Sequence, residues 1–151
     1  MPSYSAPVKD MMFLYEKLRD NKNYNDLERY NEVSSDLVKD ILEEAAKINQ
    51  NLILPLAKAG DENPAVLENG VVRTPPGYKE AYQKYIEDGW TSLSCDPKYG
   101  GQGMPKTVSA FFDEMLSSAS LSFKLYSDCL LYTSDAADEG LGVDLGGRRI
   151  I

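Results

Sequence analysis

The chain has 151 residues and a formal net charge of −8 at pH 7, with no histidine and two cysteines. This length allows one domain with a core of its own but is short for a multi-layered cofactor enzyme. The acidic balance disfavours a nucleic-acid partner, because phosphate binding needs clustered Lys and Arg. Without histidine the commonest general base and metal ligand are missing, and two cysteines form neither a disulfide framework nor a metal cluster, so we expect no metal site.

Targeting and membrane signals are missing from the sequence. No stretch approaches the roughly 20 consecutive apolar residues that a membrane span requires. The N-terminus, Met1-Pro2-Ser3-Tyr4, lacks the basic and apolar regions of a signal peptide. We therefore expect a cytoplasmic protein in a reducing compartment.

Two helices are predicted in the first part of the chain. The first runs from about Pro7 to residue 20, since proline suits a first helical position. A polar, Asn-rich connector follows over residues 21–32. The second and longest helix begins after the capping candidates at 34–36. Its apolar side is a stripe at spacings of three and four: Leu37, Ile41, Ala45, Ile48 and Leu52.

Proline and glycine mark the end of this second helix and the elements after it. Pro55 predicts a kink or stop near Leu54, and Gly60 is a C-terminal signal. The dipeptide Asn69-Gly70, between short apolar runs, predicts a small β-hairpin near 65–73. A third helix spans 78–88, with Ala81, Tyr82, Tyr85 and Ile86 on one face.

The fourth helix starts near residue 105 or 106 and runs beyond Ser118. Its apolar face comprises Val108, Phe111, Phe112, Met115, Leu116 and Ala119. Together these periods predict an all-α helical bundle with one small hairpin.

A glycine-rich segment joins the third and fourth helices and contains Tyr99-Gly100-Gly101-Gln102-Gly103. It does not follow a strand of a βαβ unit and lacks the Lys-Ser/Thr pair of a P-loop, so it is not a nucleotide-binding motif. Glycines here let the backbone take positive φ and let another surface approach closely. A tight helix-to-helix turn and a substrate-facing loop both remain open.

The last 23 residues, 129–151, resemble translated adapter DNA. Residues 129–134 are encoded by TGT CTC TTA TAC ACA TCT, which resembles the mosaic end of transposase-based sequencing libraries. Residues 135–139 continue that adapter, and 142–151 match the flanking primer in the same frame after a gap of the length of a sample index. The sequence is therefore divided into an N-terminal extension (1–33), a helical domain (34–128) and a non-native tail (129–151) expected to be disordered.

The natural part resembles the N-terminal helical domain of acyl-CoA dehydrogenases. In that family a Trp or Leu, an acidic-Pro or Pro-acidic pair and Tyr-Gly-Gly-x-Gly connect two helices, as residues 90–103 do here, and Glu114 matches the glutamate of the following helix. The segments 1–14, 67–72 and 74–82 resemble a branch with an additional N-terminal segment. That branch includes long-chain-type bacterial enzymes and 3-methylmercaptopropionyl-CoA dehydrogenases.

The resemblance implies a truncated flavoenzyme. Members of the family oxidise an acyl-CoA to a 2-enoyl-CoA in fatty acid β-oxidation, with FAD as cofactor and electron-transfer flavoprotein as partner, and are usually homo-oligomers. The catalytic glutamate belongs to a C-terminal domain that this chain lacks, so we assign no catalytic residue here and expect the fragment to be inactive. The acidic residues Glu16, Glu43, Glu44 and Glu114 are interpreted as solvated helix positions, and Cys95 as an inert thiol.

Two groups of site residues follow from the resemblance. Phe111, Phe112 and Met115 are candidates for lining the acyl pocket, although residues at helical spacing are also typical of ordinary core. The family loop motif is represented by Tyr99, Gly100, Gly101 and Gly103. Alternative hypotheses are the acyl-CoA oxidase branch and, from another class, a stand-alone α-helical interaction module that binds a partner through its Tyr and Phe faces.

Overall fold

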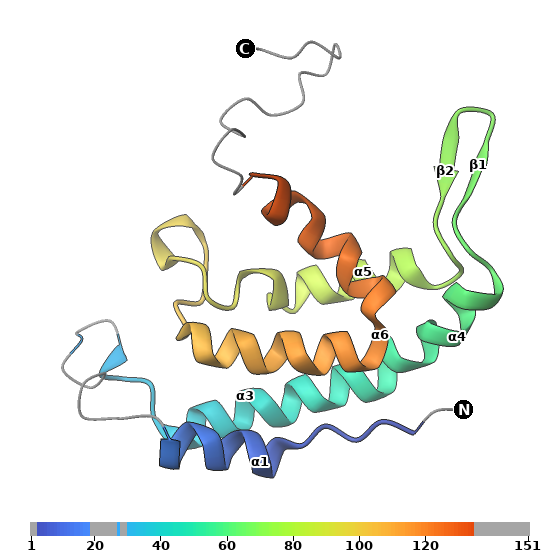
Figure 1. Cartoon of the computed structure of the whole chain (residues 1–151). Helices are drawn as coiled ribbons and strands as arrows, with labels where there is room; N and C mark the ends of the chain where they lie inside the picture. Colours follow the sequence, from blue (N-terminus) through green and yellow to red (C-terminus); the bar gives the residue numbers. More distant parts are fainter. Residues whose placement is uncertain (1–2, 19–26, 28–29, 135–151) are drawn as a thin grey trace.

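The computed structural model describes residues 3–18, 27 and 30–134, with side chains as far as Ser127. The elements are α1 (Val8–Phe13), η1 (Leu14–Leu18), α3 (Ser35–Ile48), η3 (Asn49–Ile53), α4 (Leu54–Glu62), β1 (Val66–Glu68), β2 (Val71–Arg73), α5 (Tyr78–Glu87), η4 (Trp90–Ser92), η5 (Pro97–Tyr99) and α6 (Lys106–Ser134). Figure 1 shows α1 and the first part of α6 on opposite sides of the long α3–α4 rod, with α5 beyond α6. The all-α prediction with one hairpin is confirmed.

The second helix begins where the sequence predicts, but a different side of it is buried. Ser34 is the N-cap, and its Oγ accepts from the Leu37 amide at 3.1 Å. The side chains that face the core are Val38, Leu42, Ala45, Asn49 and Ile53. Of the predicted stripe only Ala45 is buried; Ile41, Ile48 and Leu52 are partly buried and Leu37 is exposed. Apolar residues occupy two neighbouring stripes of this helix, and only one of them faces α1 and α6.

Pro55 is accommodated without ending the rod. The π-helical segment η3 precedes it, and Pro55 then lies in the first turn of α4, where its missing N–H is not needed. The predicted C-terminal signal at Gly60 is wrong, since α4 continues to Glu62. Glycine at position 60 instead lets the Tyr78 side chain pack closely against α4, because a Cβ there would lie 2.3 Å from the Tyr78 Oη.

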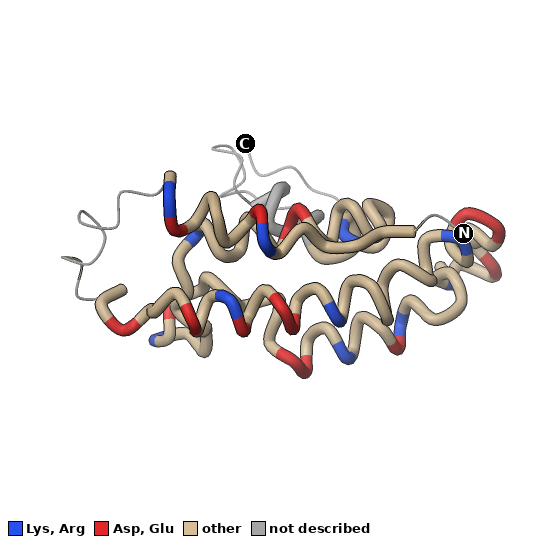
Figure 2. Tube along the Cα trace, turned by 90° about the horizontal axis from the view of Figure 1, so that it is seen from below, with Lys and Arg blue, Asp and Glu red and all other residues tan. Residues whose placement is uncertain are grey.

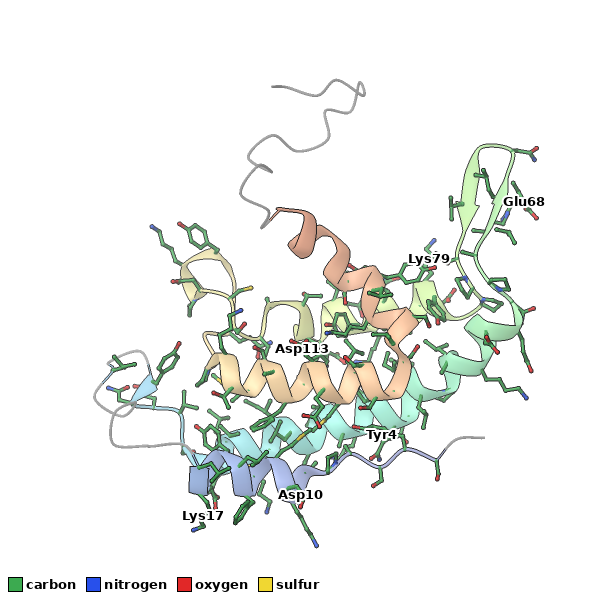
Figure 3. All side chains as sticks on the ribbon, viewed as in Figure 1. Tyr4, Asp10, Lys17, Glu68, Lys79 and Asp113 are labelled. Carbon is green, nitrogen blue, oxygen red and sulfur yellow. The ribbon has the colours of Figure 1, made fainter. Side chains whose placement is uncertain are left out.

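The hairpin near 65–73 is confirmed. Asn69 and Gly70 both have positive φ, 52° and 78°, as a type I′ turn requires. Leu67 pairs with Val72, Arg73 Nε donates to Glu68 Oε2 at 2.7 Å, and every strand residue is exposed. The hairpin projects from the helical body (Figure 1), and the labelled Glu68 points away from that body in Figure 3.

Helix α6 is bent at Ser120, whose φ of −161° and ψ of 99° are extended rather than helical. The Ser120 Oγ accepts from the Phe123 amide at 3.3 Å and so caps the second part of the helix. The bend brings Phe123 against α5, with ring centroids 5.5 Å from Tyr78 and 6.0 Å from Tyr85. The predicted face of α6 is fully buried, whereas Ile86 on α5 is 46% exposed.

The two ends of the chain lie partly outside the described residues. The extension packs on α3, and its Ala6 amide donates to Gln50 Oε1 of η3 at 2.8 Å. Met11 and Tyr15 join the core. Leu14 and Leu18 of η1 are exposed. At the other end the backbone of α6 reaches Ser134, and residues 135–151 of the predicted tail are not described.

We predict that Gly60→Ala lowers the free energy of unfolding by about 1–3 kcal/mol, because the new methyl group overlaps the buried Tyr78 hydroxyl. In a Tyr78→Phe background the same change should cost little. The nearest ring carbons would lie at 3.0 and 3.2 Å, a tight contact, and alanine has the higher helix propensity by about 1 kcal/mol. Urea unfolding of the four chains of this double-mutant cycle measures the coupling, and strict additivity would contradict the packing role of Gly60.

Candidate functional site

Aromatic rings hold α5 and the Trp90 turn against α6. The Trp90 and Phe112 rings stack with centroids 4.7 Å apart at an interplanar angle of 6°. The Tyr85 ring also stacks on Phe112, with centroids 5.9 Å apart. Each such pair contributes about 0.5–1.5 kcal/mol beyond its area burial. The cluster therefore fixes where the loop after Trp90 leaves the bundle.

The three pocket candidates of the fourth helix belong to this core. Phe112 is 2% exposed and Met115 is fully buried, while Phe111 is 8% exposed. These side chains do not line the grooves beside the hairpin, between α3–α4 and α5, beside α1 or beside Leu93. Within this chain the three residues pack the helices together, and their role toward a substrate stays a prediction.

The glycine-rich loop is held by its own backbone. The five consecutive amides from Gly100 to Met104 donate to carbonyl groups of residues 92–97, over distances of 2.9–3.1 Å. A Cβ at Gly101 would lie 2.2 Å from the Cys95 carbonyl, and Gly103 has a positive φ of 69°. Because each amide already has an acceptor inside the loop, none is left to cradle a phosphate.

The outer side of this loop is open to solvent. Tyr99 is 80% exposed, and the Lys98 ammonium lies 5.5 Å from the centre of its ring. Asp96 Oδ1 caps the short turn by accepting from the Lys98 amide at 2.9 Å, and Gln102 Nε2 anchors the loop to the Gly89 carbonyl at 2.8 Å. The loop lies at the end of the molecule opposite the hairpin (Figure 1). A tight turn and an exposed tyrosine are thus combined in one segment.

The four glutamates that we interpreted as solvated helix positions, and not as general bases, are exposed. Glu43 and Glu44 form helix-surface ion pairs with Lys39 and Lys47, and Glu16 and Glu114 also face solvent. Figure 2 shows that charged residues of both signs are spread along the helices. No group of three or more possible metal ligands occurs among the described residues, and no helix there is long and apolar enough to cross a membrane. The Cys95 thiol is free and exposed.

Tyr4 makes a long-range contact with α6 that the periodicity of the sequence could not predict. It belongs to the N-terminal arm that runs beside the α3–α4 rod (Figure 3), and its phenol oxygen is buried without a hydrogen-bond partner of ordinary geometry. Burial raises the pKa of the Tyr4 phenol; the nearby Ser118 hydroxyl lowers it and the Glu114 carboxylate raises it. The arm therefore meets α6 at a position more than 110 residues away in the sequence.

Two curated proteins are similar to this chain. A 3-methylmercaptopropionyl-CoA dehydrogenase of Ruegeria pomeroyi is 41% identical over 136 residues, which are 90% of this chain and 23% of the relative. A broad-specificity linear acyl-CoA dehydrogenase of Mycobacterium tuberculosis is 28% identical over 130 residues, 84% of this chain and 21% of the relative. No family model matches the chain. The chain thus spans less than a quarter of the length of these relatives.

We predict that Gly101→Ala lowers the free energy of unfolding by about 2–4 kcal/mol, because the added methyl group would overlap the Cys95 backbone. Gly100→Ala is the matched control: it meets open space and carries only the strain of a φ of 84°, about 1–2 kcal/mol. Urea unfolding measures both. A loss at Gly101 no larger than that at Gly100 would rule out the close approach.

Tyr4→Phe should leave stability at pH 8 unchanged or slightly higher, because the lost hydroxyl is buried and forms no hydrogen bond of ordinary geometry. In the unfolded chain the phenol ionises near pH 10. Because the pKa of the Tyr4 phenol is raised in the folded chain, the neutral phenol favours the folded state fully below about pH 10. This contribution to the free energy of unfolding is lost as pH rises further, through the folded pKa. Unfolding at pH 8 and about 10.5 should therefore show a smaller decline for Tyr4→Phe than for the unmodified chain, whereas Tyr99→Phe, at an exposed tyrosine, should not differ from it.

Proposed function

We propose that this chain is the N-terminal helical part of a flavin-dependent acyl-CoA dehydrogenase. The observation that carries the proposal is the 41% identity to a dehydrogenase of this kind over 90% of the chain. The helical bundle and the Tyr99-Gly100-Gly101-Gln102-Gly103 loop between α5 and α6 support it. The full-length parent would catalyse α,β-dehydrogenation of an acyl-CoA thioester in fatty acid β-oxidation.

The parent's cofactor and partners follow from the same proposal. Its electrons would pass to FAD and then to electron-transfer flavoprotein, in a cytoplasmic homo-oligomer. The described residues do not fit a flavin site of their own, because the loop amides are occupied internally and the structure has no βαβ unit over these residues. Flavin binding and the catalytic base are therefore assigned to the parts of the relatives that this chain does not span.

The contribution of this part to the parent would be a wall of the acyl pocket. Helix α6 would border the acyl chain, with Phe112 and Met115 fixing the helix against α5 and α3 rather than touching the substrate. Phe111, at 8% exposed the least buried of the three candidates, is the one that we assign to the acyl chain. Tyr99 and the glycines of its loop would set the entrance at the end of the helix.

The tail is the second element of the proposal. We assign residues 129–151 to adapter DNA that was read as coding sequence, on the codon agreement in two segments of one frame. The alignment with the Ruegeria pomeroyi relative covers more residues than precede this tail, so it extends some way into it. The boundary between natural and adapter-derived residues is therefore best set by the gene itself.

The test is to amplify the gene from the source DNA and express the full reading frame. We expect the frame to leave the present sequence near codon 128 and to continue into a much longer protein. That protein should copurify with FAD and reduce an electron acceptor with an acyl-CoA, whereas the 151-residue chain should do neither. Flavin absorbance and acceptor reduction measure the two properties.

Other results would support the competing functions. A natural stop codon soon after codon 128 would favour a stand-alone interaction module. A full-length flavoprotein that passes its electrons to oxygen, with release of hydrogen peroxide, would place the parent in the oxidase branch. Flavin binding and thioester oxidation by the 151-residue chain itself would contradict the fragment proposal.

A further inference from the structure

A long groove runs between the α3–α4 rod and α5. It consists of two connected hollows of about 800 and 280 Å³ that share Glu44, Asp88 and Trp90. The larger hollow has an apolar floor made by Ile48, Leu52, Leu56, Ala81 and Trp90. The smaller one continues it past Ile41 and Leu93. This groove is distinct from the buried aromatic core, although Trp90 borders both.

The floor of the groove is the outer apolar stripe of the rod. Ile41, Ile48, Leu52 and Leu56 follow helical spacing, but they are only partly buried, at the edge of the core. The inner stripe packs against α1 and α6, whereas the described residues cover the outer stripe only in part. From Ile41 to Leu56 the stripe is roughly 22 Å long at the rise of an α-helix. A groove of this length matches a partner helix of about four turns.

The rim of the groove is acidic. Four carboxylates line the two hollows, from Asp40, Glu44, Glu80 and Asp88, against the ammonium groups of Lys47 and Lys84. Both lysines already pair with rim carboxylates, Lys47 with Glu44 and Lys84 with Asp88. Asp40 and Glu80 form no ion pair within the part of the chain whose side chains are described, so the rim keeps an excess of negative charge.

We propose that this groove docks an amphipathic α-helix with Lys or Arg on both sides of its apolar face, supplied by the remainder of the parent polypeptide. The source rests on the proposed function, since more than three quarters of each relative lies outside the aligned segment. The apolar floor supplies most of the affinity, and the acidic rim selects a basic helix and sets its orientation. A second copy of this chain is the competing occupant.

The position of Trp90 makes the groove directly observable. It is the single tryptophan of the chain and lines both hollows, so its emission reports on a bound helix. The probe is a helical peptide of about 15 residues with leucines at i, i+4, i+7 and i+11 flanked by lysines. Its twin carries glutamate at every lysine, and neither peptide contains an aromatic residue. Both are titrated into the 151-residue chain.

We expect the basic peptide to shift the Trp90 emission and to bind at least about tenfold more tightly than its acidic twin, with a preference that shrinks at high salt. Replacing Asp40→Asn together with Glu80→Gln should remove most of that preference. The matched control is Asp10→Asn with Asp61→Asn, which removes the same charge at exposed positions outside the groove. This control should keep the preference for the basic peptide. Leu52→Gln, checked for folding by circular dichroism, should weaken both peptides.

Three results would overturn the proposal. Equal binding of the two peptides would remove the charge selection, and the absence of any Trp90 response would remove the groove as the site. A change in Trp90 emission on dilution of the chain without peptide, together with a dimer in light scattering, would make a second copy the occupant.

The source of the helix is tested in the full-length parent. Hydrogen exchange of the amides of α3 and α5 should be slower there than in the 151-residue chain, and equal exchange would refute an intramolecular occupant. Thioester oxidation by the parent is measured separately. A parent that oxidises thioesters without protecting the groove would contradict only the docking proposal, whereas a protected groove in an inactive parent would contradict only the proposed function.

Discussion

The stacking of Trp90 on Phe112 and of Phe112 on Tyr85 connects the parts of this structure that matter for function. It joins α5, the turn after it and α6, and the bend at Ser120 adds Phe123 to the same cluster. Flat rings in contact exclude water over a large area and resist rotation, so they fix helix orientation more firmly than aliphatic contacts do. The glycine-rich loop that begins beside Trp90 inherits its position from this cluster.

The loop itself combines a rigid backbone with an exposed side chain. Its amides are satisfied internally, and the missing Cβ of Gly101 lets the chain pass against the Cys95 carbonyl. This arrangement explains glycine at that position without any ligand. It also leaves the Tyr99 side chain at the surface. Because its amides have internal acceptors, the loop is consistent with the proposal that assigns catalysis to the rest of the parent.

The rod α3–α4 has apolar residues on two sides, and the structure uses only one of them for its own core. The inner stripe is closed by α1 and α6, while the outer one forms the floor of the groove beside α5. The outer stripe therefore keeps apolar surface that a further helix can cover. The exposed hairpin and the exposed leucines of α6, Leu121 and Leu125, point the same way. Exposed apolar surface of this kind is typical of a site that contacts another domain or protein.

Local chemistry made several features predictable from the sequence. Asn69-Gly70 specifies positive φ at two neighbouring residues and hence the hairpin, Ser34 supplies the cap of α3, and the apolar period of α6 defines its buried face. Of the candidate site, the sequence predicted only the glycine-rich loop and the two helices that flank it. Tertiary packing alone decided which stripe of α3 is buried, why Gly60 lies inside a helix, and that Phe112 is enclosed by Trp90 and Tyr85. Those outcomes depend on which distant surfaces meet, whereas sequence periodicity reports only that an apolar face exists.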